Sequence, residues 1–277
     1  MPFLGSLRFG RLLAGLLLIG FALTASAPAA AAPLGQAAEE GADLGAQRWR
    51  SGDRDGALAA WTTALEGGAL EGGALEAGTD LPSAERARLA YNLGIAEYER
   101  GEPLRAVAWF EASLRAAPRS APTRENLEIA RAEAGLGPRR GDDLTATLIR
   151  VTSSFSRTEA EWFALFGTLL LVLAGLGEAL RGGAGWRRLL LVAVVAQLAF
   201  FAPLARHVAT ADDRPYMVVD PDGASARSEP DSGADQLGTI PAGSIVEYVD
   251  ELPGWTKIRH EGDERWVEAA VLFDLRV

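Results

Sequence analysis

Apolar residues fall into blocks along the chain, and each block has its own spacing. Between residues 36 and 137 they recur every three or four positions among polar residues, which predicts amphipathic helices. Residues 162–180 and 189–206 are almost continuously apolar. From residue 214 to residue 277, short alternating runs separated by turn residues predict strands. The pattern predicts a multidomain membrane protein with an all-α helical array, two transmembrane helices and a small all-β barrel.

The first 32 residues have the three parts of a secretory signal peptide. Arg8 and Arg11 precede the apolar run 12–23, and small residues follow it, so we expect cleavage near Ala30 to Ala32. An uncleaved anchor helix is the alternative. The run is short for a bilayer span of about 20 residues, which favours cleavage.

One helical segment recurs: "NLGIAEYERG" at residues 92–101 and "NLEIARAEAG" at residues 126–135, an offset of 34 residues. The unit 88–118 resembles a tetratricopeptide repeat, whose period is also about 34 residues. The matching residues are Leu93, Gly94, Tyr98, Gly101, Ala106, Phe110, Ser113, Leu114 and Pro118. The resemblance implies pairs of antiparallel helices whose small residues allow close approach.

An earlier unit has the same pattern of repeat residues. A Gly-rich insertion at residues 66–82 makes the spacing between the two units longer than the 34-residue period. Its matching residues are Leu44, Gly45, Trp49, Gly52, Ala57, Trp61, Ala64 and Leu65. Two positions depart from the repeat pattern. Glu97 stands where an aromatic residue is usual, and Glu128 replaces the packing glycine, as expected in a polar capping helix. An unrelated helical bundle is the alternative.

The two apolar segments are separated by an arginine-rich stretch, residues 181–188, which we interpret as a tight turn. The positive-inside rule places this turn in the cytoplasm and both flanking regions outside. Ser156 and Glu159 form a predicted capping box at the start of the first span. Residues 138–160 are interpreted as a linker or interfacial helix, with a core helix of the array as the alternative.

Two polar residues lie within the predicted spans. Glu178 lies near the end of the first span, close to Arg181, so an interfacial carboxylate is favoured over a functional intramembrane one. Gln197 in the second span has the chemistry for a hydrogen bond between helices.

The C-terminal segment, residues 214–277, predicts a barrel of about five strands, with "SIVEYV", "WTKIRH" and "ERWVEA" as the clearest. It resembles the bacterial SH3 domain. The matching residues are Ala226, Arg227, Pro230, Leu237, Gly238, Ile240, Pro241, Gly243, Val246, Gly254, Trp255, Ile258, Trp266 and Val267. Arg265 stands where that family usually has a glycine.

Composition excludes several classes of partner and site. The net charge of −10 argues against nucleic acid as a partner, and the absence of cysteine excludes disulfides and thiolate metal sites. His207 and His260 are the only histidines and lie in different segments. The sequence also contains no phosphate-binding loop and no nucleophile motif. We therefore expect a protein that is not an enzyme and that has no metal site and no cofactor. A catalytic site that forms only in a complex stays open.

Surface binding is the remaining class of function. By position in the repeat, the candidates for a peptide-binding groove are Trp49, Arg88, Tyr91, Asn92, Ile95, Tyr98 and Asn126. Trp49 and Tyr98 could instead pack between helices. The candidates for a ligand face on the barrel are Tyr248, Trp255 and Trp266. For Trp255 and Trp266, a place in the core is the favoured alternative.

The order of segments resembles the BatE proteins of the Bacteroides aerotolerance family. The resemblance implies a bacterial inner-membrane protein that crosses twice, with the array and barrel on the periplasmic side. It also implies association with von Willebrand A-domain membrane proteins and a MoxR-type ATPase, and a role in envelope stress or aerotolerance. We therefore expect a non-enzymatic membrane-anchored adaptor; the alternative is a peptidoglycan-binding protein that acts through the barrel.

Overall fold

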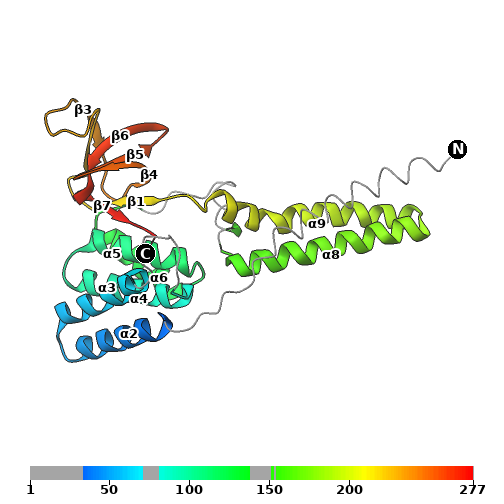
Figure 1. The fold of residues 1–277 in the computed structure, drawn as a ribbon, viewed down its shortest axis with the longest axis horizontal. Coiled ribbons are helices and arrows are strands. Elements are labelled where there is room, and N and C mark those ends of the chain that lie inside the picture. The colour runs from blue at the N-terminus through cyan, green and yellow to red at the C-terminus, as the bar shows by residue number, and fades with distance from the viewer. Residues whose placement is uncertain (1–33, 71–80, 138–150, 153, 277) are drawn as a thin grey trace. The chain divides into compact units, whose positions relative to one another are not determined.

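The computed structural model describes residues 34–70, 81–137, 151–152 and 154–276. The predicted signal peptide, most of the Gly-rich insertion and most of the 138–160 linker lie outside these residues. The chain divides into two compact units. One joins the helical array to the C-terminal sheet, and the other contains two long apolar helices (Figure 1).

Five helices, α2 to α6, form the helical array. Their bounds are α2 Leu34–Arg50, α3 Arg54–Leu70, α4 Ser83–Glu99, α5 Pro103–Ala116 and α6 Ala121–Glu133. Helix α2 packs on α3, α4 packs on α5, and α6 packs on α5. The turns inside the two pairs contain Gly52 and Gly101, whose φ angles of 85° and 79° favour glycine. Helix α3 continues to Leu70, so the insertion begins as an extension of that helix.

Each helix pair is closed by a glycine that lies against an aromatic ring. A Cβ atom at Gly94 would lie 2.6 Å from Cε1 of Phe110, and a Cβ at Gly45 would overlap the indole of Trp61. Phe110 is 1% exposed and Leu93 is fully buried. The glycines therefore let the helices of each pair approach closely.

The C-terminal segment folds as an antiparallel sheet of seven strands in the order β3-β2-β6-β5-β4-β1-β7. The strands are β1 Pro215–Val218, β2 Ala224–Arg227, β3 Gln236–Ile240, β4 Ile245–Leu252, β5 Trp255–His260, β6 Asp263–Glu268 and β7 Leu272–Asp274. The expectation of about five strands was too low, because β1 and β7 add a pair at one edge. The buried core of the sheet consists of Val218, Ala224, Ala226, Ile240, Val246, Ile258 and Val267.

Helices α8 (Arg157–Arg181) and α9 (Ala184–Ala209) pack on each other as a hairpin that could cross a membrane. The predicted capping box is confirmed: the Ser156 hydroxyl accepts from the Glu159 amide, and the Glu159 carboxylate accepts from the Ser156 amide. The predicted turn 181–188 is too long. Only Gly182 and Gly183 separate the helices, since their positive φ angles reverse the chain at once.

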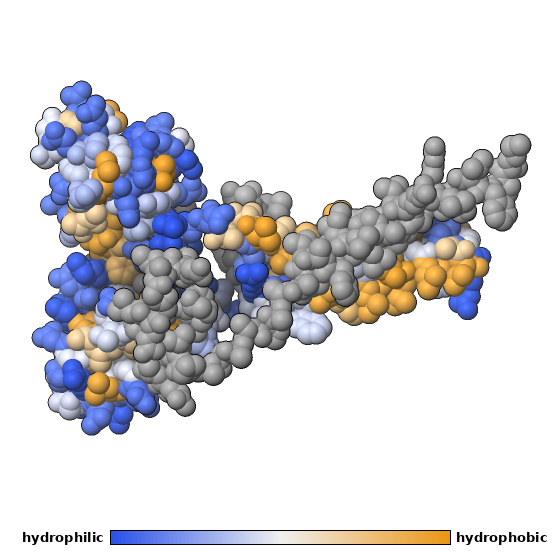
Figure 2. Space-filling view, viewed as in Figure 1, coloured by the Kyte–Doolittle hydropathy of each residue, from blue (hydrophilic) through white to orange (hydrophobic). Residues whose placement is uncertain are grey.

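The faces of the hairpin differ in side-chain size. Small residues of α8 are buried: Ala160, Ala164, Gly167, Ala174, Gly175 and Gly177. Large apolar residues point outward, among them Trp162 at 69% exposure and Leu198 at 70%, and they give the visible surface of the hairpin its apolar character (Figure 2). Close packing through small residues with an apolar exterior is typical of membrane helices.

Candidate functional site

A first hollow of about 390 Å³ lies between helices α2, α3 and α4. Its lining residues are Ala46, Trp49, Arg50, Trp61, Tyr91, Asn92 and Ile95. The ring centroid of Trp49 lies 5.7 Å from that of Trp61. On Trp49 the guanidinium of Arg54 lies 3.6 Å from the ring centroid, a cation–π contact. Trp49 thus both packs between helices and lines the hollow, so the two alternatives for this residue coexist.

A second hollow of about 420 Å³ continues along α4 towards α5 and α6. Its lining residues are Ala84, Ala87, Arg88, Tyr91, Ser113, Ala117, Ser120, Pro122 and Thr123. Tyr91 lines both hollows, and its hydroxyl accepts a hydrogen bond from Nδ2 of Asn126 at 2.9 Å. The two hollows therefore meet at a tyrosine whose position is fixed by the last helix of the array.

Among the residues that the structure describes, the charged side chains that line these hollows are Arg50 and Arg88, with no carboxylate in either lining. Arg88 is paired with Glu85 at 3.2 Å on its own helix, yet its side chain is 52% exposed. In a chain of net charge −10, the two hollows present cationic and neutral groups. Such a lining is complementary to an anionic ligand.

Six of the seven predicted groove residues are gathered around these hollows. Trp49, Tyr91, Asn92 and Ile95 line the first, Arg88 lines the second, and Asn126 holds Tyr91. Tyr98 lines neither and packs against the buried core of the array. Sequence reasoning missed Arg50, although its place directly after Trp49 in the last turn of α2 was a usable signal.

The predicted barrel residues do not share one face. Side chains alternate between the two faces of the sheet along β5, so Trp255 lies on the face opposite to that of the buried Ile258. Trp266 pairs with Lys257 and so shares the outer face with Trp255. Tyr248 pairs with Ile258 instead, which places it on the core side of the sheet.

Leu252 extends the outer aromatic pair into a small apolar patch. It pairs directly with Trp255 across the β4–β5 ladder and is 48% exposed. Both tryptophans are half-buried and lie outside the buried core of the sheet. The outer face of β4, β5 and β6 therefore offers an apolar surface to a ligand.

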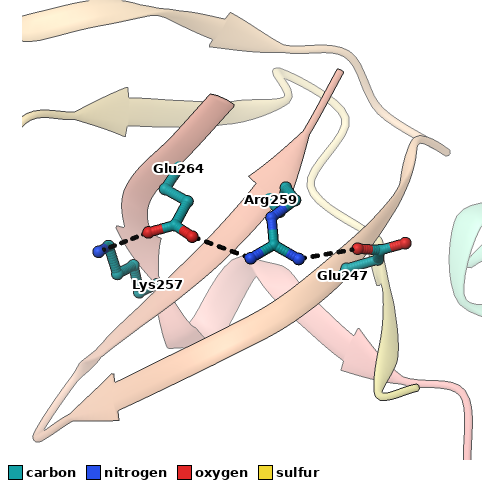
Figure 3. Close-up of polar contacts among 4 residues, drawn as sticks. All are labelled: Glu247, Lys257, Arg259 and Glu264. Atoms are coloured by element: carbon teal, nitrogen blue, oxygen red, sulfur yellow. Dashed lines mark hydrogen bonds and ion pairs between the residues drawn. The ribbon is translucent and has the colours of Figure 1, made fainter. Parts of the chain in front are cut away.

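Beside this patch, four charged side chains form a chain of ion pairs across three strands (Figure 3). Glu264 accepts from Lys257 at 2.8 Å and from Arg259 at 2.9 Å, and Arg259 also reaches Glu247 at 3.4 Å. The hydrogen bond from Lys257, and then that from Arg259, lower the pKa of Glu264. The network keeps this carboxylate ionised on the outer face.

Tyr248 belongs to a different group, beside the start of β1. Its ring stacks on Tyr216 with centroids 6.0 Å apart, and the guanidinium of Arg214 lies 5.1 Å from the Tyr248 centroid. Burial, and next the charge of Asp274, raise the pKa of Tyr216. This group covers the edge of the barrel core, since Tyr216 packs against it.

Residues 222–272 match the family model of the Bacterial SH3 domain. The sheet is therefore a bacterial SH3 domain with additional strand residues on both sides of the matched segment. No curated protein and no solved structure matches the chain. A bacterial SH3 domain suggests binding to proteins or to the cell wall.

Polar groups of the hairpin are paired in ways that suit a structural role. Nε2 of Gln197 donates to the Thr168 hydroxyl at 3.2 Å, which joins the two helices. Glu178 forms an ion pair with Arg187 at 3.0 Å. Among the described residues, no group of three or more His, Asp or Glu side chains could hold a metal ion.

Proposed function

We propose that the protein is a non-enzymatic, membrane-anchored adaptor whose helical array binds an extended segment of a partner protein. The two hollows that meet at Tyr91 carry this proposal. They lie side by side along α4, so an extended segment can occupy both. The amide of Asn92 has the donor and acceptor groups to pair with a peptide backbone.

The preferred segment carries acidic side chains. Arg50 and Arg88 lie one in each hollow, and guanidinium groups bind carboxylates through paired charge-assisted hydrogen bonds. The aromatic surface of Trp49 and Tyr91 lies between them and suits an apolar residue. A segment with acidic residues on both sides of an apolar residue fits this order.

The order of segments supports a more specific partner. A tetratricopeptide-like array, a membrane hairpin and an SH3 domain follow one another as in BatE proteins. We propose von Willebrand A-domain membrane proteins of a MoxR-type system as partners, in the bacterial inner membrane, with a role in envelope stress or aerotolerance. The array and SH3 domain would then act on the periplasmic side.

A second candidate function is cell-wall binding through the SH3 domain. The observation that favours it is the exposed Leu252 beside Trp255 and Trp266 on the outer face. Aromatic side chains of this kind stack on apolar faces of ligands. The two functions use different surfaces, so one experiment can separate them.

The test uses the full chain in detergent micelles and fluorescein-labelled peptides. One peptide has glutamates flanking a leucine, and a matched peptide has lysines in their place. We expect anisotropy to show binding of the first, weakened about tenfold by Arg50→Gln or Arg88→Gln, since a bond to a charged group contributes about 1.5–3 kcal/mol. Arg124→Gln, on the exposed face of α6, is the matched control.

Two outcomes would contradict the proposal that the array binds an acidic segment. One is equal affinity for the glutamate and lysine peptides. The other is a loss of affinity in Arg124→Gln as large as that in Arg50→Gln or Arg88→Gln. Sedimentation with purified cell wall examines the second function. If the full chain sediments and a Trp255→Ala, Trp266→Ala variant does not, while acidic peptides fail to bind, the cell-wall function replaces the adaptor function. Recovery of von Willebrand A-domain proteins from the membrane fraction, lost with Arg50→Gln and Arg88→Gln together, tests the named partner.

A further inference from the structure

Strands β1 and β7 have packing partners on both of their faces: β1 is mostly buried and β7 is partly buried. They pair with Tyr216 opposite Asp274, Met217 opposite Phe273, and Val218 opposite Leu272. Paired residues share a face, and successive residues alternate between faces. Val218 and Leu272 pack in or against the SH3 core, whereas Met217 and Phe273 pack in or against the core of the helical array. The two strands thus form a layer shared by the array and the SH3 domain.

Two residues on the side of this layer that faces the array are buried. Met217 is 1% exposed, and Leu275, directly after β7, is fully buried. The rings of Phe273 and of Trp109 from α5 lie in a T-shaped arrangement, with centroids 4.7 Å apart and planes at 77°. Aromatic pairs in this geometry are favourable beyond the area that they bury.

The end of α6 makes a second contact with the SH3 domain. Gly135 has φ 68°, and the Leu136 amide donates back to the carbonyl of Arg131 at 2.8 Å, which ends the helix in a Schellman-type turn. That turn places Leu136 against Gly243, where an added Cβ would lie 2.6 Å from Leu136 Cδ1. The last turn of the array is therefore fitted to a backbone position that has no side chain.

The residues that make these contacts lie mostly outside the segment that matches the SH3 family. The match covers residues 222–272, whereas Met217, Phe273 and Leu275 lie outside it. A β1–β7 pair that lost the array would expose Met217, Phe273 and Leu275 to water. The additional strand residues are thus suited to one occupant, the Trp109 face of this chain's own array.

We infer that the helical array and the SH3 domain form one cooperatively folded body, and that the membrane hairpin is an insertion within it. The chain leaves this body after Gly137 and returns to it at β1. The array-facing side of the SH3 domain is therefore permanently occupied and is not a ligand site. Its outer face and the hollows of the array are left as the binding surfaces of a single rigid module.

The test exploits the absence of cysteine from the chain. Single variants Met217→Cys, on the array side of β1, and Ala224→Cys, in the SH3 core, are reacted with a maleimide in the full chain in detergent. We expect both thiols to be protected equally, within about threefold in rate, because global opening of one body exposes both. Trp109→Leu should then speed labelling at positions 217 and 224 by the same factor, within about threefold, because it destabilises the one body that protects both thiols.

The contrary result is equally clear. If Met217→Cys reacts as fast as the exposed Ser228→Cys while Ala224→Cys stays protected, the array and SH3 domain are independent and the inference is wrong. If Met217→Cys does not fold, the labelling rate of Ala242→Cys can be compared with that of Ala224→Cys instead, since Ala242 also packs against the array core.

Discussion

Gly94 of α4 lies directly against the ring of Phe110 in α5, with no room for a Cβ atom between them. The contact is at the centre of the helical array, where Phe110 and Leu93 are buried. The same relationship between Gly45 and Trp61 closes the first helix pair. Close backbone approach, rather than a glycine turn, explains why both positions are glycine.

Gly94→Ala should destabilise the protein by about 1–3 kcal/mol, because the ring of Phe110 has to move within a packed core. Chemical unfolding of the full chain in detergent would measure the change. Gly137→Ala is the control, since nothing lies within 4 Å of a Cβ at that glycine; its effect should stay within about 0.5 kcal/mol. Equal effects of the two substitutions would contradict the packing argument.

Glu97 should make the array less stable as the pH rises. Burial raises the pKa of this carboxyl, and attraction to Arg100 and Arg105 offsets only part of the effect. A carboxyl whose folded pKa lies above its unfolded value stabilises the fold below the unfolded pKa, and that contribution is lost as the pH rises through the folded pKa. Glu97→Gln should therefore flatten the fall in Tm as the pH rises above the unfolded pKa of a glutamate, and it should raise Tm at neutral pH. An unchanged pH profile would show that burial of Glu97 has no energetic consequence.

Lys257→Gln should raise the pKa of Glu264, since Lys257 gives the strongest of the interactions that lower it. Ionised Glu264 stabilises the fold above its unfolded pKa, and this contribution is lost as the pH falls through the folded pKa. NMR titration of the carboxyl carbon would report the shift. Arg265→Gln, whose partner is Asp263, is the matched control and should leave the Glu264 titration in place.

Ser51 in the array and Ser228 in the SH3 domain should lie on the same side of the membrane. A hairpin that leaves one folded body and returns to it crosses an even number of times. In spheroplasts, an impermeant maleimide should label Ser51→Cys and Ser228→Cys from outside, and Gly185→Cys only after lysis. Labelling of Ser51→Cys and Ser228→Cys from opposite sides would rule out a shared body.

The sequence predicted the elements whose apolar spacing is regular. The helix pairs, the two apolar spans and strands β4, β5 and β6 follow from local periodicity, and repeat position placed Trp49, Tyr91 and Asn92 around the hollows. Strand β1 was missed because both of its faces are buried, so "PYMV" shows no alternation of polar and apolar residues. The prediction that Tyr248 shares a face with Trp255 and Trp266 was wrong. A register shift between Tyr248 and Asp250 changes the alternation along β4, so the residues before the shift and those after it do not follow one alternating pattern.

Gly183 explains why the connection between α8 and α9 is shorter than the predicted turn. With φ 107° it reverses the chain in a two-residue connection, and α9 can begin at the next residue. Sequence composition alone could not separate this from a longer turn, since Trp186 and Arg187 suit either a loop or a first helical turn.

The shared β1–β7 layer also sets an order of events during synthesis. The Trp109 face of the array is translated before the hairpin, and the strands that cover it are translated afterwards. In the proposed membrane topology, two membrane insertion steps have to be completed before that apolar face finds its partner. During this interval the face is open to a chaperone, or to β7 of a neighbouring nascent chain, which would exchange strands between two copies.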